Sequence, residues 1–118
     1  MYTSCVIDPI GLLAEVVGFA WDEGNADKNW TKHRVSQPEC EELFLNEPLL
    51  VAVDTKHSTL EPRYFALGQT DESRRLLVVF TIRELLIRVI SARDMNKNER
   101  KEYERAQTEE DSAQDSKI

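Results

Sequence analysis

The sequence predicts a small α+β domain in which an antiparallel sheet carries its helices on one face. Three strand-like runs follow one another through short links, at residues 63–70, 76–82 and 86–92. Strands in this arrangement favour antiparallel pairing. The run at 76–80 is apolar at every position, as in a strand that is covered on both faces. A length of 118 residues is sufficient for one domain with a modest core.

Composition predicts a folded cytoplasmic protein without a metal or a cofactor. The chain is 41% hydrophobic and contains two tryptophans, which disfavours disorder. No apolar run approaches the roughly 20 residues that a membrane-spanning helix needs. The N-terminus lacks basic residues and is interrupted by Asp8-Pro9, so no secretory signal is expected. Cys5 and Cys40 have no partners at metal-ligand spacing, and Cys40 is expected to fill the core.

The net charge of −7 is unevenly distributed along the chain. Residues 1–62 contain 4 basic and 11 acidic residues, whereas residues 63–108 contain 10 basic and 7 acidic residues. Residues 109–118 contain 1 basic and 4 acidic residues. An acidic protein with this asymmetry can still present a basic face. The pattern therefore permits nucleic-acid binding without requiring it.

The beginning of the chain predicts little regular structure. Residues 1–14 show no clear period and are interpreted as a poorly defined N-terminal extension. Residues 15–21 alternate weakly and predict a short strand. Asp22 is a suitable N-cap for a helix that runs to Lys32, although Gly24 weakens that helix.

A capping box gives the strongest local pattern. Ser36 and Glu39 have the spacing of a reciprocal helix cap, with a proline tolerated in the first turn. Val35 before the cap and Cys40 at the fourth helical position are placed as a hydrophobic staple. The helix is expected to run to about Leu45.

The remaining links are polar. A strand at 49–53 precedes a polar loop at 54–58, and residues 71–73 form the next turn. Glu84-Leu85 must also turn the chain if its flanking strands pair, yet neither residue favours a hairpin turn.

A second capping pattern begins the last helix. Asn96 followed by Glu99 predicts a helix of about ten residues. Few apolar residues can dock it, so light docking is expected: Met95, Tyr103 and Ala106. Residues 108–118 predict a disordered polar tail, which leaves 15–107 as the folded domain.

Arginines lie within or beside the three strand-like runs, at 63, 75, 83, 88 and 93. An arginine inside an apolar strand is costly to bury unless it is paired. These positions therefore predict a polar sheet face or edge with a function. Arg88 and Arg93 point to opposite faces unless a bulge intervenes.

A series of short motifs spans about residues 17–105. The motifs are Phe19-x-Trp21-Asp22-Glu23, Lys28-Asn29-x-x-Lys32-His33-x-Val35, Glu42-x-Phe44 with Pro48, Asp54-x-x-His57-Ser58-x-x-Glu61-x-Arg63-Tyr64, Ala66-Leu67-Gly68, Ile87-Arg88-Val89-Ile90-Ser91-Ala92-Arg93 and Glu99-Arg100-x-x-Tyr103-Glu104. In this order they resemble the BrnT toxins. Ala20 and the turn Glu84-Leu85-Leu86 depart from the family pattern, and the first 14 residues have no counterpart in it.

The resemblance implies a RelE-like fold and a ribonuclease toxin of a type II toxin–antitoxin pair that inhibits translation. It implies a BrnA-type antitoxin with a ribbon-helix-helix part, and contact with operator DNA only through that antitoxin. The expected chemistry is metal-independent RNA cleavage by attack of a 2′-hydroxyl on the adjacent phosphate. Arginine suits stabilisation of the phosphorane, and histidine suits proton transfer. Strand-end Ser91-Ala92-Arg93 is similar to the Gly-His-Arg of RelE and ParE relatives, where the arginine can serve the active site.

Each candidate site residue has a structural alternative. The predicted catalytic residues are Arg93, His57, Arg63 and Arg88, and the predicted RNA-binding residues are Lys32, His33, Arg83 and Tyr103. Arg93 can instead pair with Glu99 or Asp94, His57 can cap its loop through Asp54, and Glu61 can pair with Arg63. Tyr103 can be the anchor of the last helix. Trp21 and Trp30 are core or antitoxin-contact candidates.

Two rival functions remain open. The first is a catalytically weak protein with a toxin fold that binds the antitoxin and acts as a corepressor. The second is a toxin against DNA gyrase, by analogy of fold with ParE relatives.

Overall fold

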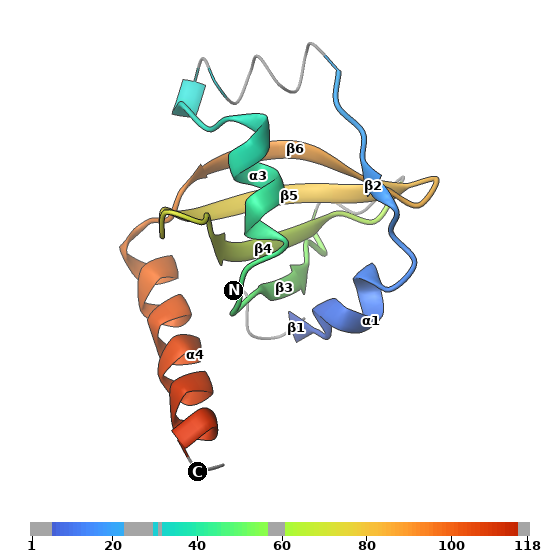
Figure 1. The fold of residues 1–118 in the computed structure, drawn as a ribbon. Coiled ribbons are helices and arrows are strands. Elements are labelled where there is room, and N and C mark those ends of the chain that lie inside the picture. The colour runs from blue at the N-terminus through green and yellow to red at the C-terminus, as the bar shows by residue number, and fades with distance from the viewer. Residues whose placement is uncertain (1–5, 23–29, 31, 57–60, 116–118) are drawn as a thin grey trace.

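The fold of the computed structural model is a six-stranded sheet with helices on both faces (Figure 1). The structure describes residues 6–22, 30, 32–56 and 61–115. The strands are β1 (Val6–Ile7), β2 (Gly18–Phe19), β3 (Leu50–Val53), β4 (Tyr64–Gln69), β5 (Arg75–Arg83) and β6 (Leu86–Asp94). The helices are α1 (Pro9–Leu13), α3 (Gln37–Leu43) and α4 (Lys97–Asp115).

The sheet has the order β1-β3-β4-β5-β6-β2. All neighbours pair antiparallel except β2, which lies parallel to β6 at one edge. Strands β3 to β6 are consecutive in sequence and form a meander, as their short links predicted. This arrangement confirms the α+β class with a mainly antiparallel sheet.

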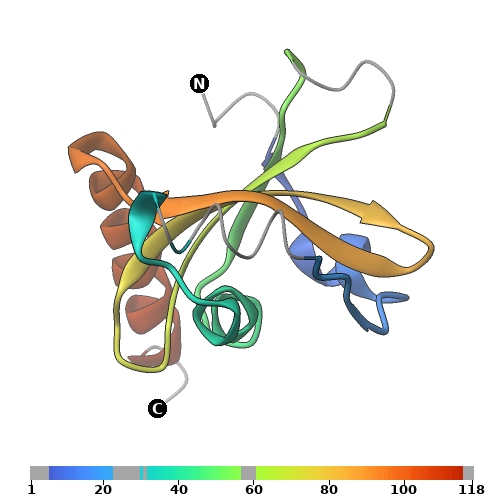
Figure 2. The ribbon, with the colours of Figure 1, turned by 90° about the horizontal axis from the view of Figure 1, so that it is seen from above.

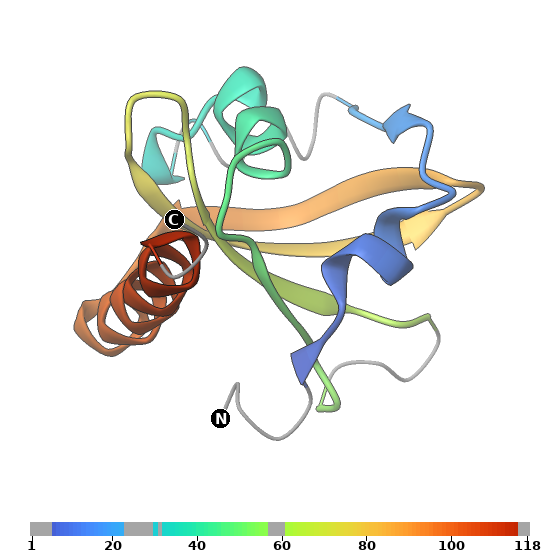
Figure 3. The same ribbon diagram turned by 60° about the horizontal axis from the view of Figure 1, so that its bottom comes forward.

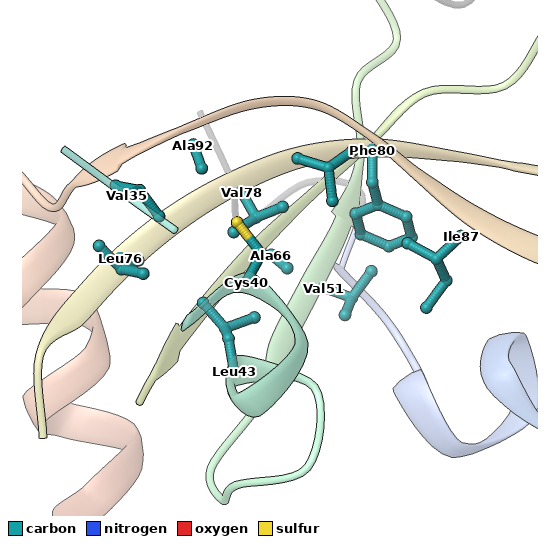
Figure 4. Packing of buried hydrophobic residues seen from close by; sticks show 11 residues of the cluster. Val35, Cys40, Leu43, Val51, Ala66, Leu76, Val78, Phe80, Ile87 and Ala92 are labelled. Carbon is teal, nitrogen blue, oxygen red and sulfur yellow. The ribbon is translucent and has the colours of Figure 1, made fainter. Parts of the chain in front are cut away.

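Helix α3 packs on one face of the sheet, over the larger apolar cluster (Figure 4). Strand residues that alternate along β4 and β5 point towards it, among them Ala66, Val78 and Phe80. A Cβ atom on Gly68 would lie 2.6 Å from Cγ of the fully buried Leu43, so the close approach of α3 to β4 requires glycine. Leu12 and Leu13 of α1 pack against the same cluster. We call this side of the sheet the α3 face.

Helix α4 packs on the opposite face (Figure 3). Leu67 and Leu77 form a second cluster there with Met95 and Tyr103. Tyr103 has no exposed surface, and its hydroxyl donates a 2.7 Å hydrogen bond to the carbonyl oxygen of Pro48. Met95 and Tyr103 supply apolar contacts of α4, as predicted. The prediction that all helices lie on one face is wrong for α4. The physical reason is the apolar character of β4 and β5 at successive positions, because both of their faces then need cover.

Both predicted capping boxes are present. In α3, Ser36 Oγ accepts from the backbone N–H of Glu39 at 3.3 Å, and Glu39 Oε1 accepts from the backbone N–H of Ser36 at 3.0 Å. In α4, the same reciprocal bonds join Asn96 and Glu99, at 2.9 Å each. Val35 and Cys40 are both buried, as the staple predicted.

Some segments differ from their predictions at the chain ends. Val6–Ile7 pairs with β3 and Pro9–Leu13 is helical, although 1–14 was predicted to be poorly defined. Helix α4 continues to Asp115, through part of the predicted disordered tail. Residues in both places lack a strong local pattern. Pairing with β3 forms β1, and α4 continues through a segment in which Glu, Ala and Gln favour a helix while Thr, Ser and Asp do not.

Other predictions near the N-terminus are only partly tested. The strand predicted over 15–21 is limited to Gly18–Phe19. The helix predicted from Asp22 to Lys32 falls mostly on residues 23–29, which lie outside the described residues. In the part of the chain that is described, no helix has the length and apolar character to cross a membrane.

The β5–β6 hairpin turns through Glu84 and Leu85 alone. Arg83 pairs with Leu86, and the two turn residues have φ angles of 55° and 66°. A two-residue loop with both φ angles positive is the geometry that favours Asn-Gly. The turn lies where pairing of the flanking strands required it, but Glu and Leu adopt this conformation only under strain.

Candidate functional site

A bulge in β6 decides which side chains share a face. Val79 pairs with Ser91, but the next residue, Phe80, pairs with Val89. Ile90 is therefore an extra residue in β6. One extra residue reverses the alternation of side chains along a strand.

Because of this bulge, Arg88 and Arg93 lie on the same sheet face. Arg88 pairs with Thr81 and Arg93 with Leu77, and these partners are four residues apart on β5. The expectation of opposite faces held only for an unbulged strand. The distance between the two arginine backbones is about 13 Å along the sheet, so the two side chains are separate sites rather than one clamp.

Three arginines gather at one end of this face. Arg63 directly precedes β4, where Tyr64 pairs with Phe80, so the register continues with Arg63 opposite Thr81. Thr81 in turn pairs with Arg88, which places the backbones of Arg63 and Arg88 about 10 Å apart across β5. Arg83 follows two residues after Thr81 and points to the same side. We call Arg63, Arg83 and Arg88 the arginine cluster.

The arginine cluster lies at the hairpin end of the sheet, away from α4. Figure 2 shows α4 at one end of β5 and β6, while the hairpin turn extends from the other end. The apolar contacts of α4 are with Leu67 and Leu77, whose positions are well before Thr81 in the register. Helix α4 thus covers one half of this face and leaves the half with the cluster uncovered by a described helix.

Two carboxylates contact the cluster. Arg83 donates from Nη2 to both carboxylate oxygens of Glu61, at 2.8 and 3.0 Å, and Arg88 Nη2 donates to Asp22 Oδ2 at 2.8 Å. All four side chains retain at least 35% exposure. Hydrogen bonding to Glu61 raises the pKa of Arg83. Glu61 therefore pairs with Arg83 rather than with the predicted partner, Arg63. Exposed pairs of this kind add little to stability because water screens them.

Thr81 fixes the backbone beside the cluster. Its side chain is fully buried, and its hydroxyl donates a 2.7 Å hydrogen bond to the carbonyl oxygen of Pro62. This bond ties the segment that contains Glu61 and Arg63 to β5 near its hairpin end. Sequence reasoning missed Thr81, because a threonine within an apolar strand reads as an ordinary strand residue.

Arg93 is held by a different kind of partner. It forms two bonds to the carboxylate of Glu99, at 2.8 and 2.9 Å, and a third to the carbonyl oxygen of Asp94 at 3.1 Å. Glu99 is only 1% exposed and also caps α4 through Asn96. Arg93 therefore forms the ion pair with Glu99 that was expected as the structural alternative to a catalytic role. Its catalytic role stays a prediction.

Of the predicted RNA-binding residues, Arg83 belongs to the arginine cluster, whereas Lys32 and His33 lie at the other end of the sheet. The carbonyl oxygen of His33 accepts a 3.2 Å bond from Arg74, which pairs with Asp94 at the far end of β6. That end is about 17 Å from Arg88, by the five register positions that separate their partners on β5. Lys32, next to His33, is exposed in the same region.

The remaining predicted residues have different outcomes. Tyr103 is buried with its hydroxyl bonded, so the prediction that it stacks on RNA is wrong and the anchoring interpretation is correct. His57 lies outside the described residues. Cys40 fills the core as predicted; burial raises the pKa of its thiol to about 12 and keeps it protonated. Within the described ranges, no group of three or more His, Cys, Asp or Glu side chains is placed to hold a metal ion.

Arg74 is a structural residue that sequence reasoning missed. It donates to the carbonyl oxygens of His33 and Arg34, to Glu39 at 3.0 Å and to both oxygens of Asp94. Hydrogen bonding from Arg74 lowers the pKa of Asp94. Burial alone would raise the pKa of Glu39, but bonds from the backbone of Ser36 and from Arg74 outweigh it and leave that pKa lowered. These contacts join the start of α3 to the end of β6.

The comparison with known families gives one match. The model of the family described as the ribonuclease toxin BrnT of type II toxin–antitoxin systems matches residues 21–99, about two-thirds of the chain. The chain belongs to the BrnT family. No curated protein matches it in the search of individual sequences.

The match to BrnT covers the structural features of the site. It includes α3, strands β3 to β6, the bulge and the whole arginine cluster, together with the two carboxylates that contact the cluster. It begins after β2, so β1 and α1 lie outside it. As a BrnT protein the chain is a member of a family of ribonuclease toxins that have antitoxin partners. The RelE-like relationship stays a prediction.

Proposed function

We propose that this BrnT protein is an endoribonuclease that cuts RNA in the cytoplasm and thereby inhibits translation. The observation that carries the proposal is the arginine cluster, which gathers Arg63, Arg83 and Arg88 at the hairpin end of one sheet face, where no described helix covers it. Guanidinium groups bind phosphate oxygens through two parallel hydrogen bonds, so a cluster on rigid strands suits a phosphodiester.

The proposed reaction is transesterification at phosphorus without a metal. The 2′-oxygen forms a bond to the adjacent phosphorus as its proton passes to a base, and the bond from phosphorus to the 5′-oxygen breaks as that oxygen gains a proton. The products are a 2′,3′-cyclic phosphate and a 5′-hydroxyl. The arginine cluster stabilises the additional negative charge of the phosphorane. Because DNA lacks the attacking hydroxyl, the reaction is confined to RNA.

The proton transfers require a group other than arginine, whose side chain stays protonated. His57 is the candidate that the sequence offers, with an ordinary pKa near 6.5 for its residue type. It precedes Glu61, the partner of Arg83, by only four residues.

The proposed partner is a BrnA-type antitoxin with a ribbon-helix-helix part. Operator DNA would then be contacted by the antitoxin and not by this chain, in keeping with a net charge of −7. A basic protein would be expected for direct DNA binding.

One observation favours the rival role of a catalytically weak, antitoxin-binding corepressor. Carboxylates pair with Arg83, Arg88 and Arg93. An arginine that holds a carboxylate must release it before it can hold a phosphate.

The test is induced expression without antitoxin, with growth and RNA integrity followed together. Growth arrest with fragmented RNA is expected for the wild type, and Arg88→Ala and His57→Ala are expected to relieve both. The matched control is Arg105→Ala, because Arg105 lies on α4 with a 69% exposed side chain and only a 3.7 Å contact to Glu102. Intact RNA and normal growth, with soluble wild-type protein, would contradict the ribonuclease proposal and favour the corepressor role.

A further inference from the structure

The carboxylates that contact the arginine cluster lie in a different kind of segment from those that contact the other arginines. Asp22 and Glu61 lie outside the strands, whereas Arg83 and Arg88 lie within β5 and β6. Asp22 follows β2 and Glu61 precedes β4. The cations are thus on the rigid sheet, and the anions are on connecting segments.

The two pairs are also accessible to a competitor. Side-chain exposure is 54% for Arg83 and 35% for Glu61, and it is 35% for Arg88 and 48% for Asp22. The pair between Arg93 and Glu99 is different, because Glu99 is 1% exposed and also caps α4. A ligand in solution can therefore exchange with Asp22 and Glu61 but not with Glu99.

Carboxylate and phosphate present similar oxygen pairs to a guanidinium group. Arg83 holds Glu61 through two parallel bonds, from Nε to Oε2 at 3.3 Å and from Nη2 to Oε1 at 2.8 Å. It would use the same geometry for two phosphate oxygens. The register puts the backbones of Arg83 and Arg88 about 8 Å apart, two residues along and one strand across. Two neighbouring phosphates of one strand can therefore reach the two arginines separately.

We infer that Asp22 and Glu61 occupy two phosphate positions of the arginine cluster in the protein without RNA, and that the backbone of single-stranded RNA displaces them. Asp22 and Glu61 then act as built-in competitors that weaken RNA binding. Neutralising both carboxylates makes the local charge beside the three arginines more positive by two. This inference rests on the proposed function and assigns its substrate contacts.

The experiment measures binding of a short fluorescent single-stranded oligonucleotide whose 2′-hydroxyls are methylated, so that it cannot be cut by the proposed reaction. Asp22→Asn and Glu61→Gln are each expected to tighten binding about two- to fivefold relative to the wild type. Each is also expected to steepen the salt dependence by about 0.7 in log–log slope over about 50–200 mM salt. Glu104→Gln is the matched control, because Glu104 pairs with Arg75 beside α4 and is 58% exposed; it should leave binding unchanged.

The outcomes separate the inference from the proposed function. Unchanged or weaker binding by both carboxylate variants, with Arg88→Ala still weakening it, would overturn the inference and leave the cluster as the RNA site. Binding that neither Arg88→Ala nor Arg83→Ala weakens would overturn the proposed site itself. Thermal unfolding of every variant accompanies the measurement, and the exposed positions of Asp22 and Glu61 predict unfolding temperatures close to that of the wild type.

Discussion

Arg88 and Arg93 are on the same face of the same strand, yet their carboxylate partners give them different roles. Asp22 is half exposed beside Arg88, whereas Glu99 is almost fully buried beside Arg93. Removal of one member of a buried pair leaves a charge without its counter-charge in a place that water does not reach. A substitution at Arg93 therefore tests stability as well as chemistry.

We expect Arg93→Ala to lower the free energy of unfolding by about 2–3 kcal/mol, somewhat below the full cost for a buried pair because Arg93 itself is partly exposed. Urea denaturation measures this change. Arg88→Ala is the comparison and should lower it by less than about 1 kcal/mol. An unfolding midpoint for Arg93→Ala equal to that of the wild type would show that the pair with Glu99 does not stabilise the fold.

At the scale of elements, the helix caps and the main strands could be predicted because their signals are local. Ser36 with Glu39 and Asn96 with Glu99 each define a helix start within four residues. The bulge at Ile90 and the positive φ angles of the turn at Glu84-Leu85 could not be predicted. Both are set by pairing along the whole of β5 and β6, and tertiary pairing overrode the local preference of these residues.

The β5–β6 turn gives a prediction of increased stability. Glu84→Asn with Leu85→Gly supplies the two residue types that accept positive φ angles at these positions. We expect the double variant to be more stable by about 1 kcal/mol, since the cost of the left-handed conformation falls at both residues. Thermal unfolding should show a rise of several degrees. A fall in the unfolding temperature would mean that the Leu85 side chain makes a contact worth more than this strain.

Arg74 joins three elements and gives a prediction about pH. The pKa values of Asp94 and Glu39 are lowered in the folded protein, so the stability from these carboxylates is present above their unfolded pKa values, near 4. That stability is lost as pH falls below about 4, through the lowered folded values. We expect unfolding temperature to drop less steeply over this range in Arg74→Met than in the wild type.

The size of this pH effect is limited because Asp94 is 63% exposed and solvent screens its pair. Arg75→Met is the control, since Arg75 is the next residue and pairs with Glu104 instead. Parallel curves for the wild type and Arg74→Met would contradict the role given to Arg74.

At the scale of the whole molecule, the sheet is covered unequally on its two faces. Helices α1 and α3 cover one face, while α4 covers only part of the other and leaves the hairpin end to the arginine cluster. The sequence identified Arg63, Arg83 and Arg88 as candidates, because an arginine within or beside an apolar strand is costly to bury unless it is paired. It could not group them, since the grouping depends on the register of β4, β5 and β6. Nor could it identify Asp22, which is 66 residues from Arg88 in the chain.

Single-turnover cleavage of one labelled RNA in the presence of a chelator measures whether the arginine cluster acts in metal-independent RNA cleavage. The wild type is expected to leave 2′,3′-cyclic phosphate ends. Arg88→Ala is expected to cut about a hundredfold more slowly, as on loss of one donor to a developing oxyanion, while Arg105→Ala cuts at the wild-type rate. Cleavage by Arg88→Ala at the wild-type rate, or no cleavage by folded wild-type protein, would contradict this role of the cluster.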